Sequence, residues 1–400
     1  MGLHSYRVVL ITPGVPRLVV AAVLGRLSAS MLGLSLLLAV VDHHGSYAVA
    51  GSLLTGHALA LACCAPLLGR LADAASARRV LLTCLAAHAG AYAALVGVLA
   101  GGAHVVVAGA VAVAVGATTP PAGPVTRTRW PRLVAPAQLG TAYAFDSALN
   151  SATFVVGPVL AGALAAGTSP LFAMALAGVS KVLGDLLLAT AVPRGAVRAA
   201  AGVVRRRGGP LADALVRRLL VVVGLDTFMH GALQVAAAAM AGGVAGLMLG
   251  VLAAGEVVGG LAYGARAWPG ETRAQLVTLH LAGALVLVAA ALTPTVAAVT
   301  GLYLVAGVAS GGRDTLNQLV LGQGTAAVHR TEAFAWLGTF MWAGYGAGTA
   351  VAGQIAAGGA AGAIHIAAAG SALLAAVVVR RLPRAPHPAW VRPASGTPEG

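Results

Sequence analysis

The sequence has very little charge for its length. Only 9% of its 400 residues are Asp, Glu, Lys or Arg, whereas 59% are hydrophobic and the mean hydropathy is +0.89. A soluble domain carries roughly 25% charged residues, because its surface must be hydrated. This scarcity of charge excludes an ordinary water-soluble protein and indicates a chain that lies mostly in lipid.

The sequence also lacks lysine, apart from Lys181, and has only three cysteines. Without a lysine at the end of a glycine-rich loop there is no phosphate-binding loop, which excludes an ATP-driven pump. Cys63, Cys64 and Cys84 lie in apolar runs and form no CxxC or Cys/His cluster. We therefore expect no metal, no disulfide and no cofactor.

What the sequence does contain is a series of long apolar runs, and a helix that crosses a bilayer needs about 20 such residues. The runs lie at 18–41, 47–68, 80–101, 104–126, 141–166, 170–192, 219–240, 243–265, 274–292, 296–318, 333–356 and 361–379. They predict an all-α polytopic membrane protein with twelve transmembrane helices in two pseudo-symmetric six-helix bundles.

Basic residues gather on one side of the predicted bundle. The connections after the odd-numbered runs are short and contain no Lys or Arg, whereas the other side holds 22 of the 25 basic residues. Because positively charged loops stay in the cytoplasm, we expect both termini there. The net charge of +14 then reflects membrane orientation, and without a recognition motif we expect no nucleic-acid partner. Arginine in place of lysine, with much Ala and Gly, is typical of a bacterial genome of high G+C content, so the expected location is the bacterial cytoplasmic membrane.

The two halves contain short matches at one constant spacing. Gly69-Arg-Leu-Ala matches Gly259-Gly-Leu-Ala, and Thr141-Ala-Tyr-Ala-Phe matches Thr331-Glu-Ala-Phe-Ala, each pair 190 positions apart. A duplicated six-helix unit is typical of one large class of transporters. The expected divisions are an N-terminal bundle over 1–192, a basic cytoplasmic linker over 193–218, a C-terminal bundle over 219–379 and a disordered cytoplasmic tail over 380–400.

The segment Gly69-Arg-Leu-Ala-Asp73-Ala-Ala-Ser-Ala-Arg78-Arg79 is similar to the Gly-x-Leu-x-Asp-x-x-Gly-Arg-Arg/Lys signature of the major facilitator superfamily. Ser76 stands in place of the second glycine and Ala77 in place of the first basic residue. The resemblance covers nearly the whole chain and implies a transporter, usually monomeric, in which Gly69, Asp73, Arg78 and Arg79 belong to a cytoplasmic latch between the halves. The alternative is a charged turn that only follows the positive-inside rule.

The fifth run contains Gly157-Pro158-Val-Leu-Ala-Gly162, which is similar to the Gly-Pro element of exporters in that superfamily. The resemblance implies efflux, whereas the alternative is close helix packing without a directional role. The run 104–126 lacks the arginine that many drug–proton antiporters carry there. The resemblance therefore does not carry their usual proton-antiport mechanism over to this chain.

Six ionisable residues lie at membrane depth, which is costly and marks candidate functional residues. They are Arg26, Asp146, Lys181, Asp185, Asp226 and Glu256. Glu256, next to glycines, and then Asp226 are the candidates to carry a coupling proton. Arg26 is a candidate to bind an anionic substrate group or to pair with a carboxylate.

The remaining charges have plainer interpretations. Lys181 and Asp185 are four residues apart on one helix face and are expected to neutralise each other as an intramembrane pair. Asp146 lies near an inner helix end and is assigned to the cytoplasmic gate, together with the arginines between the fourth and fifth runs. The neighbours Arg313 and Asp314, at the inner end of the run 296–318, are interpreted as another gate pair. Four histidines in apolar runs are expected to be packed or hydrogen-bonded: His57, His88, His280 and His365.

Aromatic and amide side chains in three runs are candidates to line a central cavity. They are Asn150, Gln234, Trp336, Phe340, Trp342 and Tyr345. Such a lining would suit an amphipathic or planar ligand. The alternative for most of them is lipid contact or packing.

Together these features predict a secondary active transporter and not an enzyme. It would move a small molecule by alternating access, coupled to protons in the direction of efflux. Its partners would be the substrate, a coupling proton and the lipid bilayer, and it would be a monomer. A uniporter or importer of the same fold, a membrane-embedded enzyme and a non-transporting sensor are the alternatives.

Overall fold

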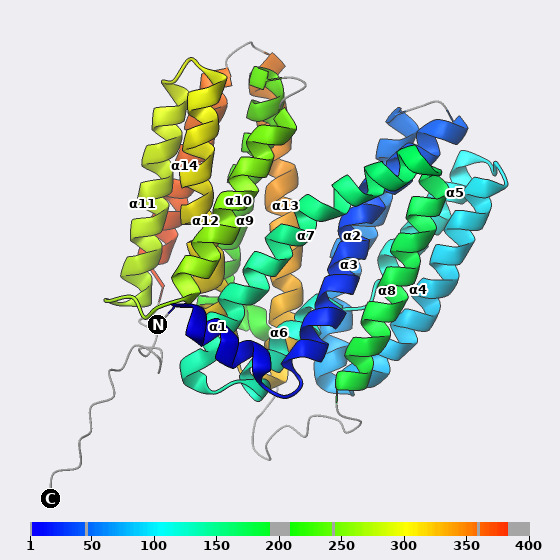
Figure 1. Cartoon of the computed structure of the whole chain (residues 1–400), viewed down its shortest axis with the longest axis horizontal. Helices are drawn as coiled ribbons and strands as arrows, with labels where there is room; N and C mark the ends of the chain where they lie inside the picture. Colours follow the sequence, from blue (N-terminus) through cyan, green and yellow to red (C-terminus); the bar gives the residue numbers. More distant parts are fainter. Residues whose placement is uncertain (1, 45–46, 193–208, 242–244, 358–360, 383–400) are drawn as a thin grey trace, which may run out of the picture.

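A computed structural model describes residues 2–44, 47–192, 209–241, 245–357 and 361–382 (Figure 1). These residues form α-helices joined by short turns, and none of them is in a β-strand. The helices are α1 (Gly2–Ile11), α2 (Val15–His44), α3 (Tyr47–Ala74), α4 (Ala77–Ala100), α5 (Val105–Thr118), α6 (Ala122–Leu133), α7 (Leu139–Gly167), α8 (Pro170–Ala191), α9 (Ala214–Ala241), α10 (Ala245–Gly264), α11 (Thr272–Ala291), α12 (Val296–Gly324), α13 (Arg330–Ala357) and α14 (Ala361–Arg380). The prediction of an all-α polytopic chain is confirmed.

Within the described residues, eleven helical segments are long and apolar enough to cross a membrane. Each matches one of the twelve predicted runs, and α13 is the predicted crossing that is not among them. With 28 residues α13 is long enough, but its sequence contains many Gly and Thr residues and two Trp, which lowers its hydropathy. The twelfth crossing therefore stays a prediction.

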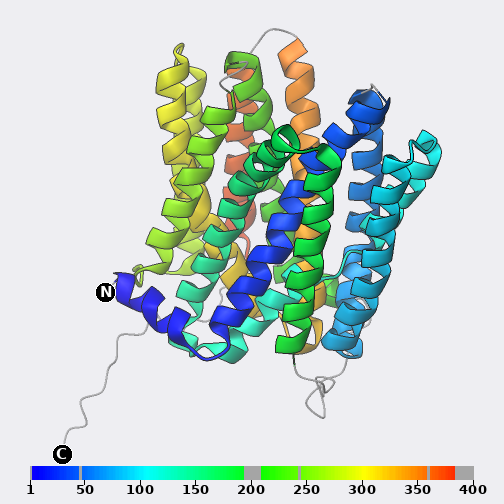
Figure 2. The same cartoon turned by 45° about the vertical axis from the view of Figure 1, so that its right-hand side comes forward.

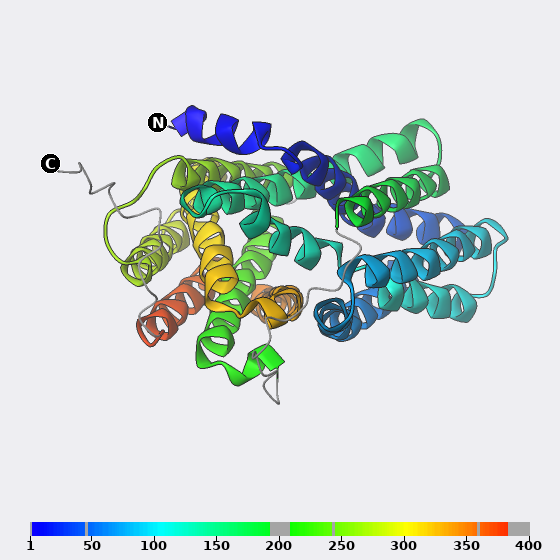
Figure 3. The ribbon, with the colours of Figure 1, turned by 90° about the horizontal axis from the view of Figure 1, so that it is seen from below.

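Two local features differ from the predicted runs. The N-terminal segment forms a separate helix, α1, which lies across one end of the bundle (Figures 1 and 3). The predicted run 104–126 is divided at residues 119–121 into α5 and α6. Pro120 and Pro121 lie at this break, because proline has no backbone N–H to donate within a helix.

The helices form two groups, α2–α8 and α9–α14, which are seen side by side in Figure 3. Most of the predicted linker (193–208) and most of the predicted tail (383–400) lie outside the described residues. The last part of the predicted linker is helical, because α9 begins at Ala214. The division of the chain into two bundles, a linker and a tail stays a prediction.

One apolar cluster joins the two groups at a single end of the molecule. It includes Trp130 and Tyr143 from the first group and Leu316 and Phe334 from the second. This is the end at which α1, α6 and the first residues of α4 and α11 lie, and we call it the basic end. Toward the other end each group has its own apolar cluster, and the groups diverge (Figures 1 and 2).

Helices α10 and α12 are in very close contact through four glycines. A Cβ atom on Gly255 or Gly259 would overlap the backbone of α12, and one on Gly307 or Gly311 would overlap the backbone of α10. Small residues at a helix interface allow such close approach in membrane proteins. The contact is therefore reciprocal, and it holds the two helices together along several turns.

Candidate functional site

The candidate site begins on one face of α9. Asp226, His230 and Gln234 are spaced four residues apart, so their side chains lie on the same side of the helix. His230 is partly exposed, with 27% of its side-chain surface accessible, whereas Asp226 is buried and Gln234 is exposed. These three side chains form a polar stripe along the membrane-spanning part of α9.

His230 connects α9 to Glu256 on α10. Its Nε2 lies 2.6 Å from a Glu256 carboxylate oxygen, and its Nδ1 lies 2.8 Å from the backbone oxygen of Asp226. Both neighbours accept hydrogen bonds, and a neutral imidazole has only one N–H to donate. The geometry of His230 therefore fits a ring with protons on both nitrogens.

Glu256 also contacts the other group of helices. The hydroxyl of Ser151 on α7 donates a hydrogen bond of 3.1 Å to the second Glu256 carboxylate oxygen. The Glu256 side chain is 17% exposed. A single carboxylate thus joins an imidazole of its own group to a hydroxyl of the opposite group.

Asp226 is held deeper in the second group by a buried arginine. The Nε atom of Arg313, on α12, lies 3.3 Å from an Asp226 oxygen, and only 2% of the arginine side chain is exposed. The Asn317 amide donates to the other Asp226 oxygen at 3.1 Å. His280 Nε2 lies 3.1 Å from Asp226 without forming a hydrogen bond, while its Nδ1 is 2.7 Å from the Leu276 oxygen.

A second buried ion cluster lies in the first group. Arg26 on α2 makes a two-oxygen contact with the Asp146 carboxylate, at 2.8 Å to each oxygen. The Nε atom of Arg127 on α6 lies 3.5 Å from the same carboxylate, which is completely buried. Arg26 is therefore paired with a carboxylate in this structure, which was one of the two expectations for it.

The interpretation of Arg313 and Asp314 as a pair is wrong for this structure, because the two side chains lie on different faces of α12. Arg313 pairs with Asp226, whereas Asp314 accepts a hydrogen bond of 2.5 Å from Ser147 on α7. Gln318 donates to both Ser147 and Asp314. Asp314 therefore contacts the opposite group, and Arg313 stays within its own.

One face of α7 carries successive contacts to the second group. Ser147 meets α12 and Ser151 meets α10, and one turn further Phe154 lies against Trp342 of α13 with ring centroids 6.4 Å apart. Phe154 and Trp342 are 46% and 49% exposed. Tyr345 stacks edge-on against Trp342 at 6.1 Å.

The other candidate lining residues have different positions. Trp336 and Phe340 contact each other edge-on at 6.5 Å and pack against the apolar cluster of the basic end. Asn150 is half-buried on α7. Lys181 and Asp185 form an ion pair of 2.6 Å within α8, buried in the first group and away from Glu256 and Asp226.

At the basic end, Asp73 bridges the two groups. Its carboxylate accepts the backbone N–H groups of Thr331 and Glu332, at 3.2 and 2.8 Å, in the first turn of α13. Gly69 lies against the same turn, since a Cβ there would be 2.9 Å from the Ala335 Cβ. Arg78 and Arg79 begin α4 at this end.

The repeated segments meet in a corresponding way on the other side. The Thr141 hydroxyl at the start of α7 donates to the Gly264 oxygen at the end of α10, at 2.7 Å. A Cβ on Gly264 would overlap Ala144. The matched segments thus place α3 against α13 and α10 against α7.

The Gly-Pro element lies in the middle of α7. Gly157 packs against Ser30 of α2 so closely that a Cβ would overlap this serine, and Pro158 is inside the helix. A Cβ atom on Gly162 would lie 3.7 Å from the Leu34 side chain. The element therefore packs α7 onto α2 within the first group.

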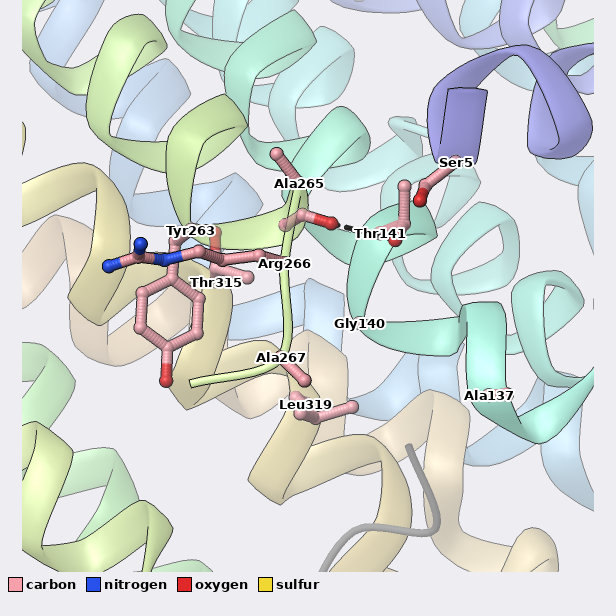
Figure 4. A pocket seen from close by; sticks show the side chains of 11 residues that line it. Ser5, Ala137, Gly140, Thr141, Tyr263, Ala265, Arg266, Ala267, Thr315 and Leu319 are labelled. Atoms are coloured by element: carbon pink, nitrogen blue, oxygen red, sulfur yellow. Dashed lines mark hydrogen bonds between the residues drawn. The ribbon is translucent and has the colours of Figure 1, made fainter. Parts of the chain in front are cut away.

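A cavity of about 270 Å³ lies at the basic end beside these contacts (Figure 4). Its lining residues are Ser5, Ala137, Gly140, Thr141, Tyr263, Gly264, Ala265, Arg266, Ala267, Thr315 and Leu319. The Arg266 guanidinium stacks on the Trp268 ring at 3.7 Å. None of the residues predicted for substrate binding lines this cavity.

Sequence reasoning missed His230, Ser147, Ser151 and Asn317. His230 could have been found, because it is four residues from Asp226 and from Gln234 in an apolar run. The serines had no such signal, since Ser and Thr occur throughout these helices.

The comparisons with known proteins agree with this architecture. A search of curated proteins finds no match to the chain. Among solved structures, the human organic anion transporter MFSD10 (TETRAN) is 18% identical, with a TM-score of 0.73 over 94% of this chain and 99% of that one. A bacterial homologue of the iron transporter ferroportin, in an outward-facing state, is 16% identical with a TM-score of 0.74, over 92% and 98%. The E. coli fucose:proton symporter FucP is 13% identical with a TM-score of 0.72, over 94% and 99%. These likenesses concern the fold.

The family model described as "Major Facilitator Superfamily" matches residues 18–232, just over half of the chain. The protein is a multi-pass membrane protein with the fold of these transporters, and the chain belongs to the major facilitator superfamily.

Proposed function

We propose that the protein is a proton-coupled secondary transporter that exports a small molecule by alternating access. The two groups of helices would act as two bundles that rock about a central site. The basic end would face the cytoplasm, in agreement with the positive-inside rule. The protein would act as a monomer in a bacterial cytoplasmic membrane, with both termini inside.

The observation that carries this proposal is the position of Glu256. Its carboxylate accepts hydrogen bonds from His230 in its own group and from Ser151 in the opposite one. A proton gained or lost by the pair changes both its internal attraction and its contact with α7. Proton binding and the relation between the two groups are thereby linked through one side chain.

The conformation of the molecule is one of the states that alternating access requires. The groups share an apolar cluster at the basic end and diverge at the other, so the site would be reached from outside the cell. An exporter that exchanges substrate for protons takes up its proton in this state. The His230 ring, which faces an oxygen atom at each nitrogen, would carry that proton.

Asp73, Gly69, Arg78 and Arg79 would form the cytoplasmic latch, with Asp146 and Asp314 as the charged layer above it. This layer would be broken when the basic end opens. Gly157, Pro158 and Gly162 would keep α7 packed on α2 during that movement. Asp226 would hold Arg313 and orient the α9 face, and so support the coupling residue.

The test uses everted membrane vesicles, acidified inside by respiration and loaded with a pH-quenched dye. Cationic, neutral and anionic compounds are added in turn. We expect one class to reverse the quench, and Glu256→Gln and Asp226→Asn to abolish that response. Glu271→Gln, an exposed carboxylate at the start of α11, is the matched control and should respond like the unaltered protein. If labelled compounds cross the membrane without any change in quench, proton coupling is wrong and uniport replaces it.

A further inference from the structure

The number of charges around the central site has a consequence for the substrate. Among the described residues, the layer around Glu256, Asp226 and Asp146 contains the side chains of three arginines and four carboxylates. They are Arg26, Arg127 and Arg313, with Asp146, Asp226, Glu256 and Asp314. The buried pair of Lys181 and Asp185 is neutral by itself. The layer therefore has one more negative charge than positive when all four carboxylates are ionised and all histidines are neutral.

Each of the three arginines contacts a carboxylate other than Glu256. Arg313 contacts Asp226, and Arg26 and Arg127 contact Asp146, with Asp314 within electrostatic range of Arg127. Neither Asp314 nor Glu256 has an arginine at ion-pair distance: Asp314 accepts hydrogen bonds from Ser147 and Gln318, whereas Glu256 contacts the ionisable ring of His230. Glu256 is also the most exposed of these acids that has a described ion pair, at 17% of its side chain.

His280 lies beside Asp226 and not beside Glu256. It is completely buried, its Nδ1 faces the Leu276 oxygen, and its Nε2 lies 3.1 Å from the Asp226 oxygen that Arg313 also contacts. His230 faces the Asp226 backbone oxygen and the Glu256 carboxylate, and a ring with protons on both nitrogens donates to both. The proton on His230 Nε2 is thus the positive charge that faces Glu256.

An uncompensated charge at membrane depth is costly, so the layer favours one added positive charge at Glu256. The proton on His230 is one way to provide it, and a bound cation is the other. If a cation pairs with the Glu256 carboxylate, the Nε2–H bond breaks and the proton leaves to water. The neutral ring keeps its Nδ1–H donor toward the Asp226 oxygen, and the charge of the layer does not change.

Aromatic side chains lie one turn from this carboxylate on the side where the groups diverge. Phe154 follows Ser151 by three residues on α7 and meets Trp342, which in turn contacts Tyr345. Aromatic faces attract organic cations through the ring quadrupole. Since Phe154 and Trp342 belong to opposite groups, a ligand between Glu256 and these rings would contact both halves of the molecule.

Resting on the proposed function, we infer that the substrate is a monovalent organic cation that binds Glu256 beside Phe154 and Trp342, in exchange for the proton shared with His230. The exchange moves one positive charge in each direction and is electrically neutral. Other groups facing the pair are Asp226 on α9, Arg313 and Asp314 on α12 and Ser151 on α7, and none of them is released by the exchange.

The test measures ligand binding to the purified protein in detergent. Tetraphenylphosphonium and tetraphenylborate have the same shape and opposite charge, and quaternary ammonium ions of increasing size cover smaller cations. We expect cations to bind and tetraphenylborate not to bind. In weakly buffered solution, cation binding should release about one proton, and affinity should rise with pH by up to about tenfold per unit while His230 is protonated.

Two matched pairs of variants locate the site. Glu256→Gln should abolish proton release, whereas Glu271→Gln should not. Phe154→Leu should weaken binding of tetraphenylphosphonium by about 2- to 30-fold, the usual range of a cation–π contact. Phe172→Leu, at an exposed phenylalanine near the start of α8, should leave it unchanged. A monodisperse elution profile for each variant shows that it is folded, and Glu256→Asp gives a second carboxylate variant if Glu256→Gln is unstable.

The outcomes separate this inference from the proposed function. If none of the cations binds, or if tetraphenylborate binds in their place, the substrate class is wrong, while proton-coupled export of another compound in vesicles can still hold. Cation binding without proton release overturns the exchange. Cation binding that is equal in Phe154→Leu and the unaltered protein overturns the position of the site.

Discussion

The carboxylate of Asp73, at the end of α3, accepts the backbone N–H of Glu332 at 2.8 Å, in the first turn of α13. A helix has unpaired N–H groups in its first turn, and a side-chain carboxylate that accepts them stabilises the helix. Here the carboxylate comes from the opposite group of helices. The stability of this helix end is therefore coupled to closure of the basic end.

Asp73→Asn should favour opening at the basic end. The amide lacks the negative charge that attracts the start of α13, so the contact weakens by about 1 kcal/mol. Spin labels at Thr83→Cys and Ala274→Cys, exposed positions near the starts of α4 and α11, report the separation of the groups. We expect their distance distribution to shift to longer values, after Cys63, Cys64 and Cys84 are replaced by serine.

Asp213→Asn is the matched control. Asp213 accepts the backbone N–H of Leu215 at 2.8 Å and so caps α9 within one group. The Asp213→Asn variant should lower the stability of the protein by a similar amount without changing the distance between the labels. Equal effects of the two variants would contradict a role of Asp73 in closure.

Gly264→Ala should also oppose closure at the basic end, by steric overlap and not by a change in charge. A Cβ at Gly264 would overlap Ala144 at the start of α7. At Gly260, one turn earlier, the nearest atom is 3.6 Å away, which is an ordinary contact. The same labels should therefore move apart in Gly264→Ala and remain in place in Gly260→Ala. No change with Gly264→Ala would show that the contact is not required.

Arg313→Met should destabilise the protein strongly. It leaves the Asp226 carboxylate without its arginine in a buried position, and breaking a buried pair costs about 3–5 kcal/mol. The double variant with Asp226→Asn should recover much of the loss, because neither partner is then an unpaired charge. Thermal unfolding in detergent measures both. A double variant that is no more stable than Arg313→Met would argue against direct pairing.

The double variant with Lys181→Met and Asp185→Leu should retain transport, unlike changes at Asp226. Both residues are buried on α8 and contact each other at 2.6 Å, so either single change leaves one unpaired charge. Replacing both removes the ion pair without touching Glu256, and we expect near-normal stability and transport. Loss of transport in a stable double variant would mean that this pair takes part in the transport cycle.

The fold could be predicted from the sequence to a large extent, because membrane crossing leaves a direct record in composition. Eleven of the predicted runs correspond to apolar helices, and their limits differ by a few residues. The run at 104–126 was predicted as continuous because its apolar residues extend to Gly116 and hide the effect of Pro120 and Pro121. Helix α1 was not predicted, since its short sequence is too weakly apolar to stand out.

The candidate site was only partly predictable. The sequence singles out Glu256 and Asp226, because charges are rare in these runs, but it does not show which residue pairs with each charge. Arg313 and Asp314 are neighbours in the chain and were interpreted as a pair, whereas successive residues of a helix point about 100° apart. Their true neighbours, Asp226 and Ser147, come from other helices, and only the packing of α12 against α9 and α7 decides between them.

The glycine contact between α10 and α12 has a mechanical consequence for the two serines of α7. Since Gly259 and Gly311 allow no space for sliding, Glu256 and Asp314 are carried by what is in effect one rigid body. Ser151 holds the first of these acids and Ser147 the second. Glu256 and Asp314 therefore move together relative to α7, and any tilt of α7 against this pair changes both serine contacts.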